Sequence, residues 1–266
     1  GIKNLYIKNE SVNPTGCFKD RGSMVELTKA LELGAKAVCV ASTGNMAASV
    51  SAYSGRAGLP CYVFVPDGTP AAKLSQSLAY GSRVIRVRGS YGDASRLAAQ
   101  VSARKGFYLA GDYAFRFEGQ KSIAFEAAEQ LNWRAPGKIF YPLGCGTNAA
   151  AGIKGFFEFK ELGLIEELPQ LIGVQPEKAD TMVSAFNAGE KTYRYVESPS
   201  SVASAVSIDR PLDYLRAFQA MRQSKGRGML VDDASILESV KMLAKTESVF
   251  VEPSSATVLG ALSKSL

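Results

Sequence analysis

The sequence predicts an α/β protein whose parallel strands are buried between helices. Short apolar runs, rich in β-branched and aromatic residues, alternate with longer amphipathic stretches along most of the 266 residues. Runs of that kind are typical of strands buried on both faces, and their alternation with helices is typical of parallel sheets. Ligands of such proteins bind at the carboxyl ends of the strands. A doubly wound architecture accounts for these features together.

The elements are expected in a regular order. Predicted strands are residues 5–7, 37–40, 62–65, 84–87, 139–141 and 171–174. Predicted helices are residues 23–33, 45–57, 71–80, 94–105, 118–131 and 148–162. Five of these helices end at a glycine, the residue most often found just past a helix: Gly34, Gly58, Gly81, Gly106 and Gly163. Residues 191–213 lack periodicity and are predicted to form a long surface connection, whereas residues 227–266 return to strand, helix, strand and helix.

Composition excludes several kinds of chemistry. The chain contains no histidine, which excludes Ser-His-Asp and Cys-His catalysis and HExxH metal binding within it. Cys17, Cys39, Cys61 and Cys145 are far apart and form no CxxC pair. Neither a disulfide framework nor a metal site is therefore predicted, and a reducing, cytoplasmic compartment fits best. Proton transfer must use lysine, a carboxylate, tyrosine, a Ser–Lys pair or a cofactor.

The distribution of charge argues against a nucleic acid or a membrane as the partner. Net charge is +6, and the 31 Lys and Arg residues are dispersed rather than gathered in one stretch. A nucleic-acid-binding protein needs a concentrated basic face, and no apolar run here is long enough to span a bilayer. We expect a solvated surface with a mild preference for anionic ligands.

Three polar, glycine-containing segments lie where strands should pass into helices. The first, residues 13–22, places Lys19 beside Phe18 at the expected mouth of a helix, after a Pro-Thr-Gly turn. An amine that is partly desolvated and close to helix N–H groups is suited to attack a carbonyl. The alternative is that Lys19 is an ordinary surface lysine paired with Asp20. The motif alone does not favour either interpretation.

The second segment, residues 41–49, follows a predicted strand directly. Ser42 and Thr43 supply hydroxyls, Gly44 lets the backbone approach a ligand, and the helix that begins near Asn45 offers unpaired amides to a carboxylate. Simple capping of that helix by Ser42 or Thr43 is the alternative, because these are favoured cap residues.

The third segment comprises Gly144, Cys145, Gly146, Thr147 and Asn148, between a predicted strand and a long helix. Glycines at a helix N-terminus form a nest for a phosphate group. The segment is neither a P-loop nor a GxGxxG fingerprint, and a tight strand-to-helix turn explains it equally well. A reactive lysine, a carboxylate loop and a phosphate loop are together what an amino-acid enzyme using pyridoxal phosphate needs.

At this point the sequence resembles a known family. Residues 13–22, 41–49, 116–122 and 251–256 look like the motifs of threonine synthase, in the fold-type-II pyridoxal-phosphate family, and they occur in the family's order. The resemblance covers nearly the whole chain. It implies two doubly wound parallel-sheet domains of the tryptophan synthase β-like kind: a large cofactor-binding domain, residues 1–35 and 121–266, and a small mobile domain, residues 36–120.

The resemblance also implies residue roles. Lys19 is expected to form the Schiff base with pyridoxal 5'-phosphate and to act as the proton-shuttling base, with Phe18 beside the cofactor. The ring hydroxyl is expected to bind Asn45, and the cofactor phosphate to bind Gly144, Cys145, Gly146, Thr147 and Asn148. Expected substrate ligands are Ser42, Thr43, Gly44, Asn45 and Arg116. The implied reaction is that of a lyase of threonine biosynthesis, which converts O-phosphohomoserine and water to threonine and phosphate, in a homodimer.

Two departures from the family pattern bear on the substrate. Met46 stands where a second threonine is usual, and Ala110-Gly111 stands where an Asn-Ser pair is usual. Because the usual side chains help to hold the substrate's phosphate, a serine/threonine dehydratase-like or other β-eliminating or β-replacing enzyme stays a second hypothesis. A non-catalytic amino-acid-binding module is a third, and Lys19 argues against it. The segment that should contact the cofactor's pyridine nitrogen is not found after residue 256, so we expect a longer functional polypeptide.

Overall fold

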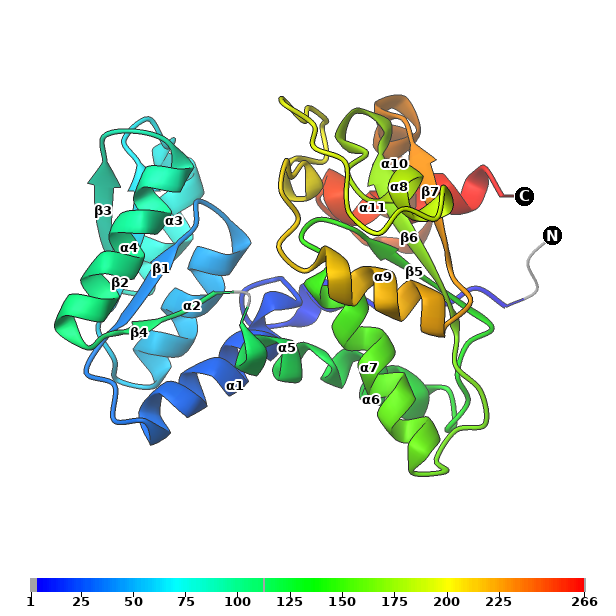
Figure 1. The fold of residues 1–266 in the computed structure, drawn as a ribbon, viewed down its shortest axis with the longest axis horizontal. Coiled ribbons are helices and arrows are strands. Elements are labelled where there is room, and N and C mark those ends of the chain that lie inside the picture. The colour runs from blue at the N-terminus through cyan, green and yellow to red at the C-terminus, as the bar shows by residue number, and fades with distance from the viewer. Residues whose placement is uncertain (1–3, 112, 266) are drawn as a thin grey trace. The chain divides into compact units, whose positions relative to one another are not determined.

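The computed structural model describes residues 4–111 and 113–265, which form two compact units (Figure 1). One unit is Asn9–Gln120, and the other is Gly1–Lys8 together with Lys121–Leu266. The predicted domains also have a boundary between residues 120 and 121. It differs in residues 9–35, which sequence analysis assigned to the large domain and which group here with the smaller unit.

The unit Asn9–Gln120 is built on a four-stranded parallel sheet with strand order β3-β2-β1-β4. Its elements are a 3-10 turn at Glu10–Val12, α1 (Lys19–Glu32), β1 (Val38–Ala41), α2 (Asn45–Arg56), β2 (Cys61–Pro66), α3 (Ala71–Ala79), β3 (Arg83–Val87), α4 (Tyr91–Lys105), β4 (Tyr108–Leu109) and α5 (Ala114–Gln120). The short strand β4 was not predicted, because two residues carry too little periodicity to be recognised.

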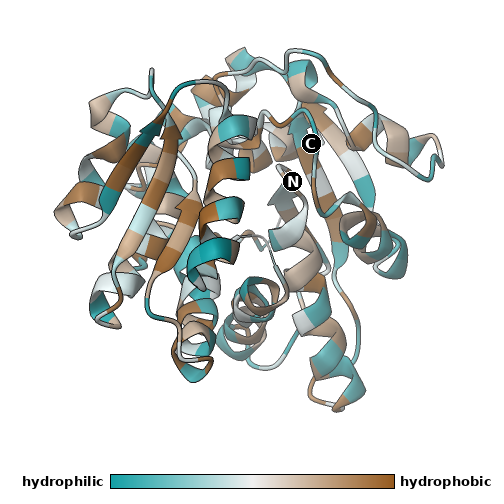
Figure 2. Ribbon diagram, turned by 60° about the vertical axis from the view of Figure 1, so that its left-hand side comes forward, coloured by the Kyte–Doolittle hydropathy of each residue, from teal (hydrophilic) through white to brown (hydrophobic). Residues whose placement is uncertain are grey.

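Helices cover both faces of this sheet, as the continuous apolar runs predicted. Val38 and Val40 of β1 lie in a core cluster with residues of α1, α2 and α3. Cys39, between them, belongs to a second cluster with residues of α4, because successive side chains of a strand point to opposite faces. Figure 2 shows the resulting hydrophobic colour along the strands. Burial raises the pKa of the Cys39 thiol to about 11.

Helix α1 belongs to this unit because it packs against α5 through two glycines. A Cβ atom on Gly119 would lie 2.2 Å from the carbonyl oxygen of Arg21, and one on Gly22 would lie 2.6 Å from Cγ of Arg116. Such distances are shorter than real Cβ contacts, so the two helix backbones can approach this closely only with glycine at both positions. This contact explains why residues 9–35 group with the smaller unit.

The second unit is built on a three-stranded parallel sheet with order β5-β6-β7. Its helices and strands are α6 (Ser122–Gln130), β5 (Lys138–Pro142), α7 (Thr147–Glu161), β6 (Gln170–Pro176), α8 (Val183–Asn187), α9 (Tyr214–Gln223), β7 (Arg227–Val231), α10 (Asp233–Glu247) and α11 (Pro253–Ser263), with 3-10 turns at Glu177–Ala179 and Ser204–Val206. One core cluster joins the sheet to α10 and α11, and another lies between α6 and α7. The predicted doubly wound α/β class is confirmed.

Three predicted elements were wrong. Residues 5–7 form no strand, and their side chains are about half exposed, since an apolar triplet without a pairing neighbour gains little by extending. Predicted helix 118–131 is two helices, α5 and α6, separated at Lys121. The second strand expected within 227–266 is a coil between α10 and α11, and the short helices α8 and α9 were not predicted.

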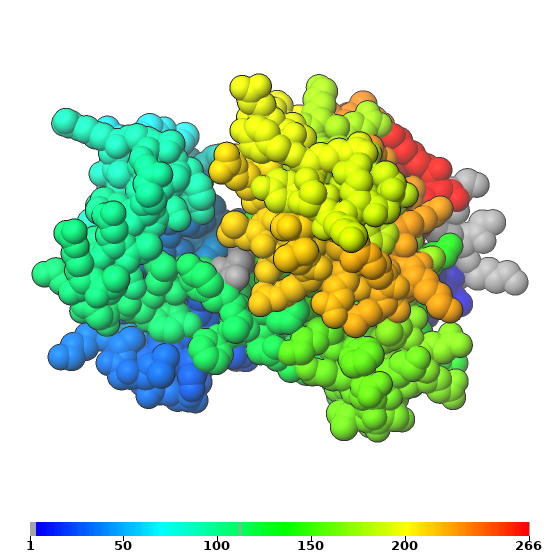
Figure 3. Space-filling view, in the orientation of Figure 1, coloured from blue at the N-terminus to red at the C-terminus, as the bar shows by residue number. Residues whose placement is uncertain are grey.

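The remaining predictions concern the surface. Residues 191–213 contain a single 3-10 turn among coil, as expected of a connection, and the yellow segment of Figure 3 shows part of it on the surface of its unit. The five predicted helix-ending glycines all have positive φ angles, from 65° to 84°. Among the described residues, no helix has the length and apolar character needed to cross a membrane.

Candidate active site

Lys19 is the first residue of α1, with Phe18 as the preceding cap residue. This confirms its predicted place at the mouth of a helix. Both side chains are partly buried, and Nζ of Lys19 lies 4.6 Å from the centroid of the Phe18 ring, in a cation–π contact. The alternative pairing of Lys19 with Asp20 is not what the structure shows. The Asp20 carboxylate instead accepts hydrogen bonds from the backbone N–H and Oγ1 of Thr15, at 2.8 and 2.7 Å.

The loop that leads to Lys19 is held at two further points. Glu10 receives a two-pronged hydrogen bond from Arg21, with Nε to Oε2 at 2.6 Å and Nη2 to Oε1 at 2.8 Å. Both side chains are mostly buried, which makes such a bidentate pair stronger and more specific than a surface pair. Asn13 Nδ2 also donates to the Glu10 carboxylate at 3.0 Å. These contacts fix the turn from which Lys19 projects.

The carboxylate loop lies between β1 and α2. Gly44 is the N-cap residue of α2, no side chain caps this helix, and Asn45 is its first residue. The alternative of simple capping by Ser42 or Thr43 is therefore not realised, and the Ser42 Oγ accepts instead from the Gly44 N–H at 3.3 Å. Residues 42–46 are exposed or partly exposed. The first amides of α2 thus remain accessible to an anion, as a substrate carboxylate would require.

The predicted phosphate loop lies between β5 and α7, a helix of 15 residues. Gly146 is the cap residue, with a φ of 93°, and a Cβ there would lie 2.8 Å from Cβ of Ala217. A Cβ on Gly144 would lie 3.3 Å from the carbonyl oxygen of Ala205. The two glycines therefore line a cradle that larger residues would fill, and the helix N-terminus supplies donors to it.

Two polar side chains of this loop bear on whether a phosphate fits. Oδ1 of Asn148 is buried and accepts no hydrogen bond within the described part of the chain. Because this atom is an acceptor, an anionic phosphate does not satisfy it, and the donor that Asn148 can offer a phosphate is Nδ2. Thr147 Oγ1 donates to Oδ2 of Asp213 at 2.6 Å, and Asp213 also pairs with Arg216. The expected role of Thr147 therefore rests on its backbone N–H. The backbone N–H groups at this glycine-lined helix terminus are the donors that suit a phosphate.

Arg116 is placed differently from the prediction. Its side chain is 0% exposed, as is that of Glu26, to which it is bonded. The guanidinium also donates to Oγ of Ser23 at 3.1 Å and to the carbonyl oxygens of Gly111 and Lys19 at 3.0 and 3.3 Å. Because all three of its nitrogens have partners in the interior, Arg116 is not placed to anchor a substrate's phosphate. The alternative surface pair with Glu118 is also replaced, by the buried pair with Glu26.

The residues that depart from the family pattern have structural neighbours of their own. Met46 packs against the core cluster of β1 and β2. Ala110 is buried, and the Gly111 N–H donates to Oε1 of Glu26 at 2.9 Å. Burial, followed by the nearby Glu26 carboxylate, raises the pKa of Tyr108 to about 12. Position 111 thus forms part of the surroundings of the Glu26–Arg116 pair.

The predicted site residues are divided between the two units. Phe18, Lys19 and residues 42–45 belong to Asn9–Gln120, whereas residues 144–148 belong to the other unit. Their convergence on a single cleft stays a prediction. Within the first unit, Lys19 and Asn45 each begin a helix, and these two helices are joined through a hydrogen bond from Ser49 to Ser23 of 2.6 Å.

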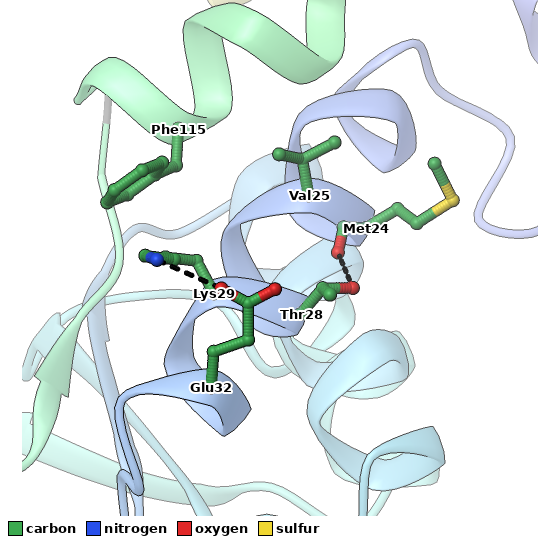
Figure 4. A pocket seen from close by; sticks show the side chains of 6 residues that line it. All are labelled: Met24, Val25, Thr28, Lys29, Glu32 and Phe115. Atoms are coloured by element: carbon green, nitrogen blue, oxygen red, sulfur yellow. Dashed lines mark hydrogen bonds and ion pairs between the residues drawn. The ribbon is translucent and has the colours of Figure 1, made fainter.

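A separate shallow pocket lies on α1 and α5. It has a volume of about 230 Å³ and is lined by Met24, Val25, Thr28, Lys29, Glu32 and Phe115 (Figure 4). Lys29 pairs with Glu32 at 2.9 Å and lies over the Phe115 ring. The predicted cofactor and substrate ligands are not among its lining residues, so it is not the candidate active site.

Sequence reasoning missed the residues that hold the site from within. Ser23, Glu26 and Ser49 are completely buried, yet in the sequence they read as ordinary helix residues. Asp213 is 66 positions from Thr147, which it contacts. One signal in the sequence could have identified Glu26. It lies on the same side of α1 as the apolar residues Leu27 and Ala30, facing the core, and a carboxylate there is rarely buried without a charged partner.

Several known proteins are similar to this chain in sequence. A model of the family "pyridoxal-phosphate dependent enzyme" matches residues 1–266. The chain is 44% identical to the threonine synthase of Methanocaldococcus jannaschii, over all of this chain and 66% of that protein. It is 42% identical to the threonine synthase of Methanosarcina acetivorans, over 99% of this chain and 66% of that protein. The chain thus spans just under two thirds of these relatives.

A solved structure is similar in fold. The processed form of threonine deaminase isoform 2 from Solanum lycopersicum superimposes with a TM-score of 0.83, over 97% of this chain and 69% of that chain, at 23% sequence identity. At that level of identity the similarity shows the fold alone. It supports the fold-type-II architecture that the motifs implied.

Proposed function

Because this chain belongs to the family of pyridoxal-phosphate-dependent enzymes, we propose that its protein is a threonine synthase, a lyase that converts O-phosphohomoserine and water to threonine and phosphate. The observation that carries this proposal is the high identity to two threonine synthases over essentially the whole chain. Since the chain spans just under two thirds of those relatives, the activity, substrate and partners of the whole protein are all part of the proposal.

The donor set suits the cofactor. Pyridoxal 5'-phosphate supplies an aldehyde for a lysine and a ring that withdraws electrons from the bound amino acid. The phosphate would bind the cradle of Gly144, Gly146 and the first backbone N–H groups of α7. Lys19 would hold the aldehyde carbon covalently, with Phe18 beside it. Asn45 would hydrogen-bond the ring hydroxyl.

The protein's own residues would then act on the substrate. Lys19, once its amine is released, would take a proton from the substrate's Cα and return it at a neighbouring carbon, because no histidine is available for this task. The accessible amides and hydroxyls of residues 42–45 would hold the carboxylate and so orient Cα toward the amine. Arg116 is not among the proposed substrate ligands, since its guanidinium is buried and fully bonded.

A dehydratase-like reaction is the second candidate. Met46 and Ala110-Gly111 favour it, because these positions lack the side chains that help threonine synthases to hold the substrate's phosphate. The proposed enzyme would need other residues for that phosphate. Incubation of the cofactor-loaded protein with O-phosphohomoserine, threonine and serine separately decides between the two: threonine and phosphate from the first compound support the synthase, and 2-oxo acids from the others support the dehydratase.

The first prediction concerns Lys19. Protein loaded with pyridoxal phosphate should absorb visible light, and borohydride reduction should abolish this band and leave the cofactor on the peptide that contains Lys19. The variant Lys19→Ala should lose the label and at least about a thousandfold of the turnover, because it lacks both the covalent attachment and the base. Lys29→Ala is the matched control, since Lys29 lies further along α1, outside the site. Full turnover in Lys19→Ala contradicts the proposal.

We further propose a homodimer in the cytoplasm, with a small phosphorylated amino acid as its partner and no nucleic acid. Support comes from the family resemblance and from the dispersed basic residues. Light scattering of the purified protein measures the mass that decides the oligomeric state.

A further inference from the structure

A buried network of polar side chains joins the two helices that carry the predicted ligands. It consists of Ser23, Glu26, Ser49 and Arg116, each 0% exposed. Arg116 Nη2 donates to both Glu26 Oε2 and Ser23 Oγ, and Ser49 Oγ donates to Ser23 Oγ at 2.6 Å. The remaining carboxylate oxygen of Glu26 accepts from the Gly111 N–H. We call these four residues the buried network.

The buried network contacts one proposed cofactor ligand, Lys19, and reaches the helix that begins with the other, Asn45. Arg116 Nη1 donates to the carbonyl oxygen of Lys19 itself, so it contacts the first turn of α1 at the residue that carries the amine. Ser49 lies one helical turn after Asn45 on α2. Through Ser23, the network therefore links the start of α1 to the start of α2, within a single compact unit.

Stability alone is a weak reason for this arrangement. Removing two charges from water is costly, and a buried ion pair is often no more stabilising than apolar residues of the same size. A fully bonded buried network does, however, select one arrangement of the elements that it joins. The close contact of Gly22 and Gly119 restricts the distance between α1 and α5, while the network restricts how α1 is turned and shifted relative to α2.

We infer that the buried network of Ser23, Glu26, Ser49 and Arg116 positions the Lys19 amine relative to the Asn45 amide, and so sets how tightly and in which protonation state the cofactor is held. The inference rests on the proposed function, because it presumes that Lys19 and Asn45 bind the same cofactor. None of the four is a catalytic residue, since each acts through Lys19 or Asn45. Arg116, predicted to bind substrate, is reassigned as a positioning residue.

The test compares two serines of α2. Ser49→Ala removes the link between α2 and the network. Ser51→Ala removes an equally buried hydroxyl of α2 that bonds the Ala47 carbonyl, at 2.6 Å, and the Cys61 thiol. Each full-length variant is titrated with pyridoxal phosphate, and the pH midpoint of the visible band and the thermal midpoint are measured. Ser49→Ala should weaken cofactor binding about three- to tenfold, the effect of one lost hydrogen bond, and should shift the pH midpoint.

Ser51→Ala should leave both cofactor readouts within about twofold of wild type while losing comparable thermal stability. Arg116→Lys keeps the charge but not the planar fork that reaches four partners, and it should shift the pH midpoint further than Ser49→Ala. Equal cofactor affinities and pH midpoints in the two serine variants overturn the inference and leave the proposed function intact. A wild-type protein that binds no cofactor overturns the proposed function, and the inference falls with it.

Discussion

Gly146 and Gly163 lie at opposite ends of α7, and both adopt left-handed backbone conformations, with φ angles of 93° and 71°. They differ in their surroundings. A Cβ on Gly146 would meet Ala217 at 2.8 Å and the Asp213 carbonyl at 3.2 Å, whereas nothing lies within 4 Å of one on Gly163. Conformational strain is therefore shared by the two positions, whereas of these two only Gly146 would also meet steric conflict.

This pair allows a prediction about single residues. Gly163→Ala should lower the free energy of unfolding by about 1 kcal/mol, the cost of a left-handed alanine. Gly146→Ala should cost roughly 2–4 kcal/mol, because overpacking adds to that strain, and it should also weaken pyridoxal phosphate binding. Urea unfolding and absorption titration measure the two effects. If both variants bind the cofactor as wild type does, the cradle at Gly146 is not a phosphate site.

At the scale of elements, α10 begins with a cap that is coupled to the helix α11. The Asp232 carboxylate accepts from the Ser235 N–H at 2.8 Å, and Nζ of Lys264, just after α11, lies 2.8 Å from Oδ2 of Asp232. The hydrogen bond from Lys264, followed by those from Ser235, holds the pKa of Asp232 well below its usual value. One carboxylate thus serves both the helix cap and the contact with α11.

A further prediction concerns the Asp232 cap and how its contribution to the free energy of unfolding depends on pH. Because the folded-state pKa of Asp232 is depressed, the stability it contributes is fully present above the unfolded value of about 4 and is lost as the pH falls toward the folded value. Asp232→Asn keeps the cap but not the charge, so it should be slightly less stable at pH 7 and show a smaller loss between pH 4 and 2. Asp232→Ala should be the least stable at pH 7. Urea midpoints measured across this pH range test whether the charged Asp232 carboxylate stabilises the fold. If Asp232→Asn loses as much stability as wild type between pH 4 and pH 2, it does not.

At the scale of the whole molecule, the division into units bears on the proposed catalysis. The chain passes from one unit to the other after residue 8 and again after residue 120. The proposed ligands Lys19 and Asn45 belong to one unit, and the proposed phosphate loop belongs to the other.

The last prediction follows from that division. We propose that the small domain, predicted as residues 36–120, closes when substrate binds. Small-angle scattering of cofactor-loaded protein should show a smaller radius of gyration with an unreactive analogue of O-phosphohomoserine than without it. Inorganic phosphate alone is the control and should leave the radius unchanged. Equal radii with and without the analogue count against closure.

The sequence by itself determined most of the elements and the local character of the site. The runs around Val40 and Val63 are apolar on both faces, which suits only a buried parallel strand, and Lys19, Asn45 and Gly146 each lie where a strand or turn passes into a helix. These features depend on neighbours a few residues away. Residues 5–7 mark the limit, because an apolar triplet becomes a strand only where another strand is available to pair with it.

Only the tertiary structure decided the place of Arg116. In the sequence it suits a phosphate or a surface pair with Glu118, but its carboxylate partner, Glu26, is 90 positions away. Packing of Gly22 against Gly119 brings the two together in the interior, where an unpaired buried charge is costly and the pair forms. Thr147 and Asp213 meet in the same way across 66 positions. Local patterns identify which residues begin helices, whereas partners across the core depend on how those helices pack.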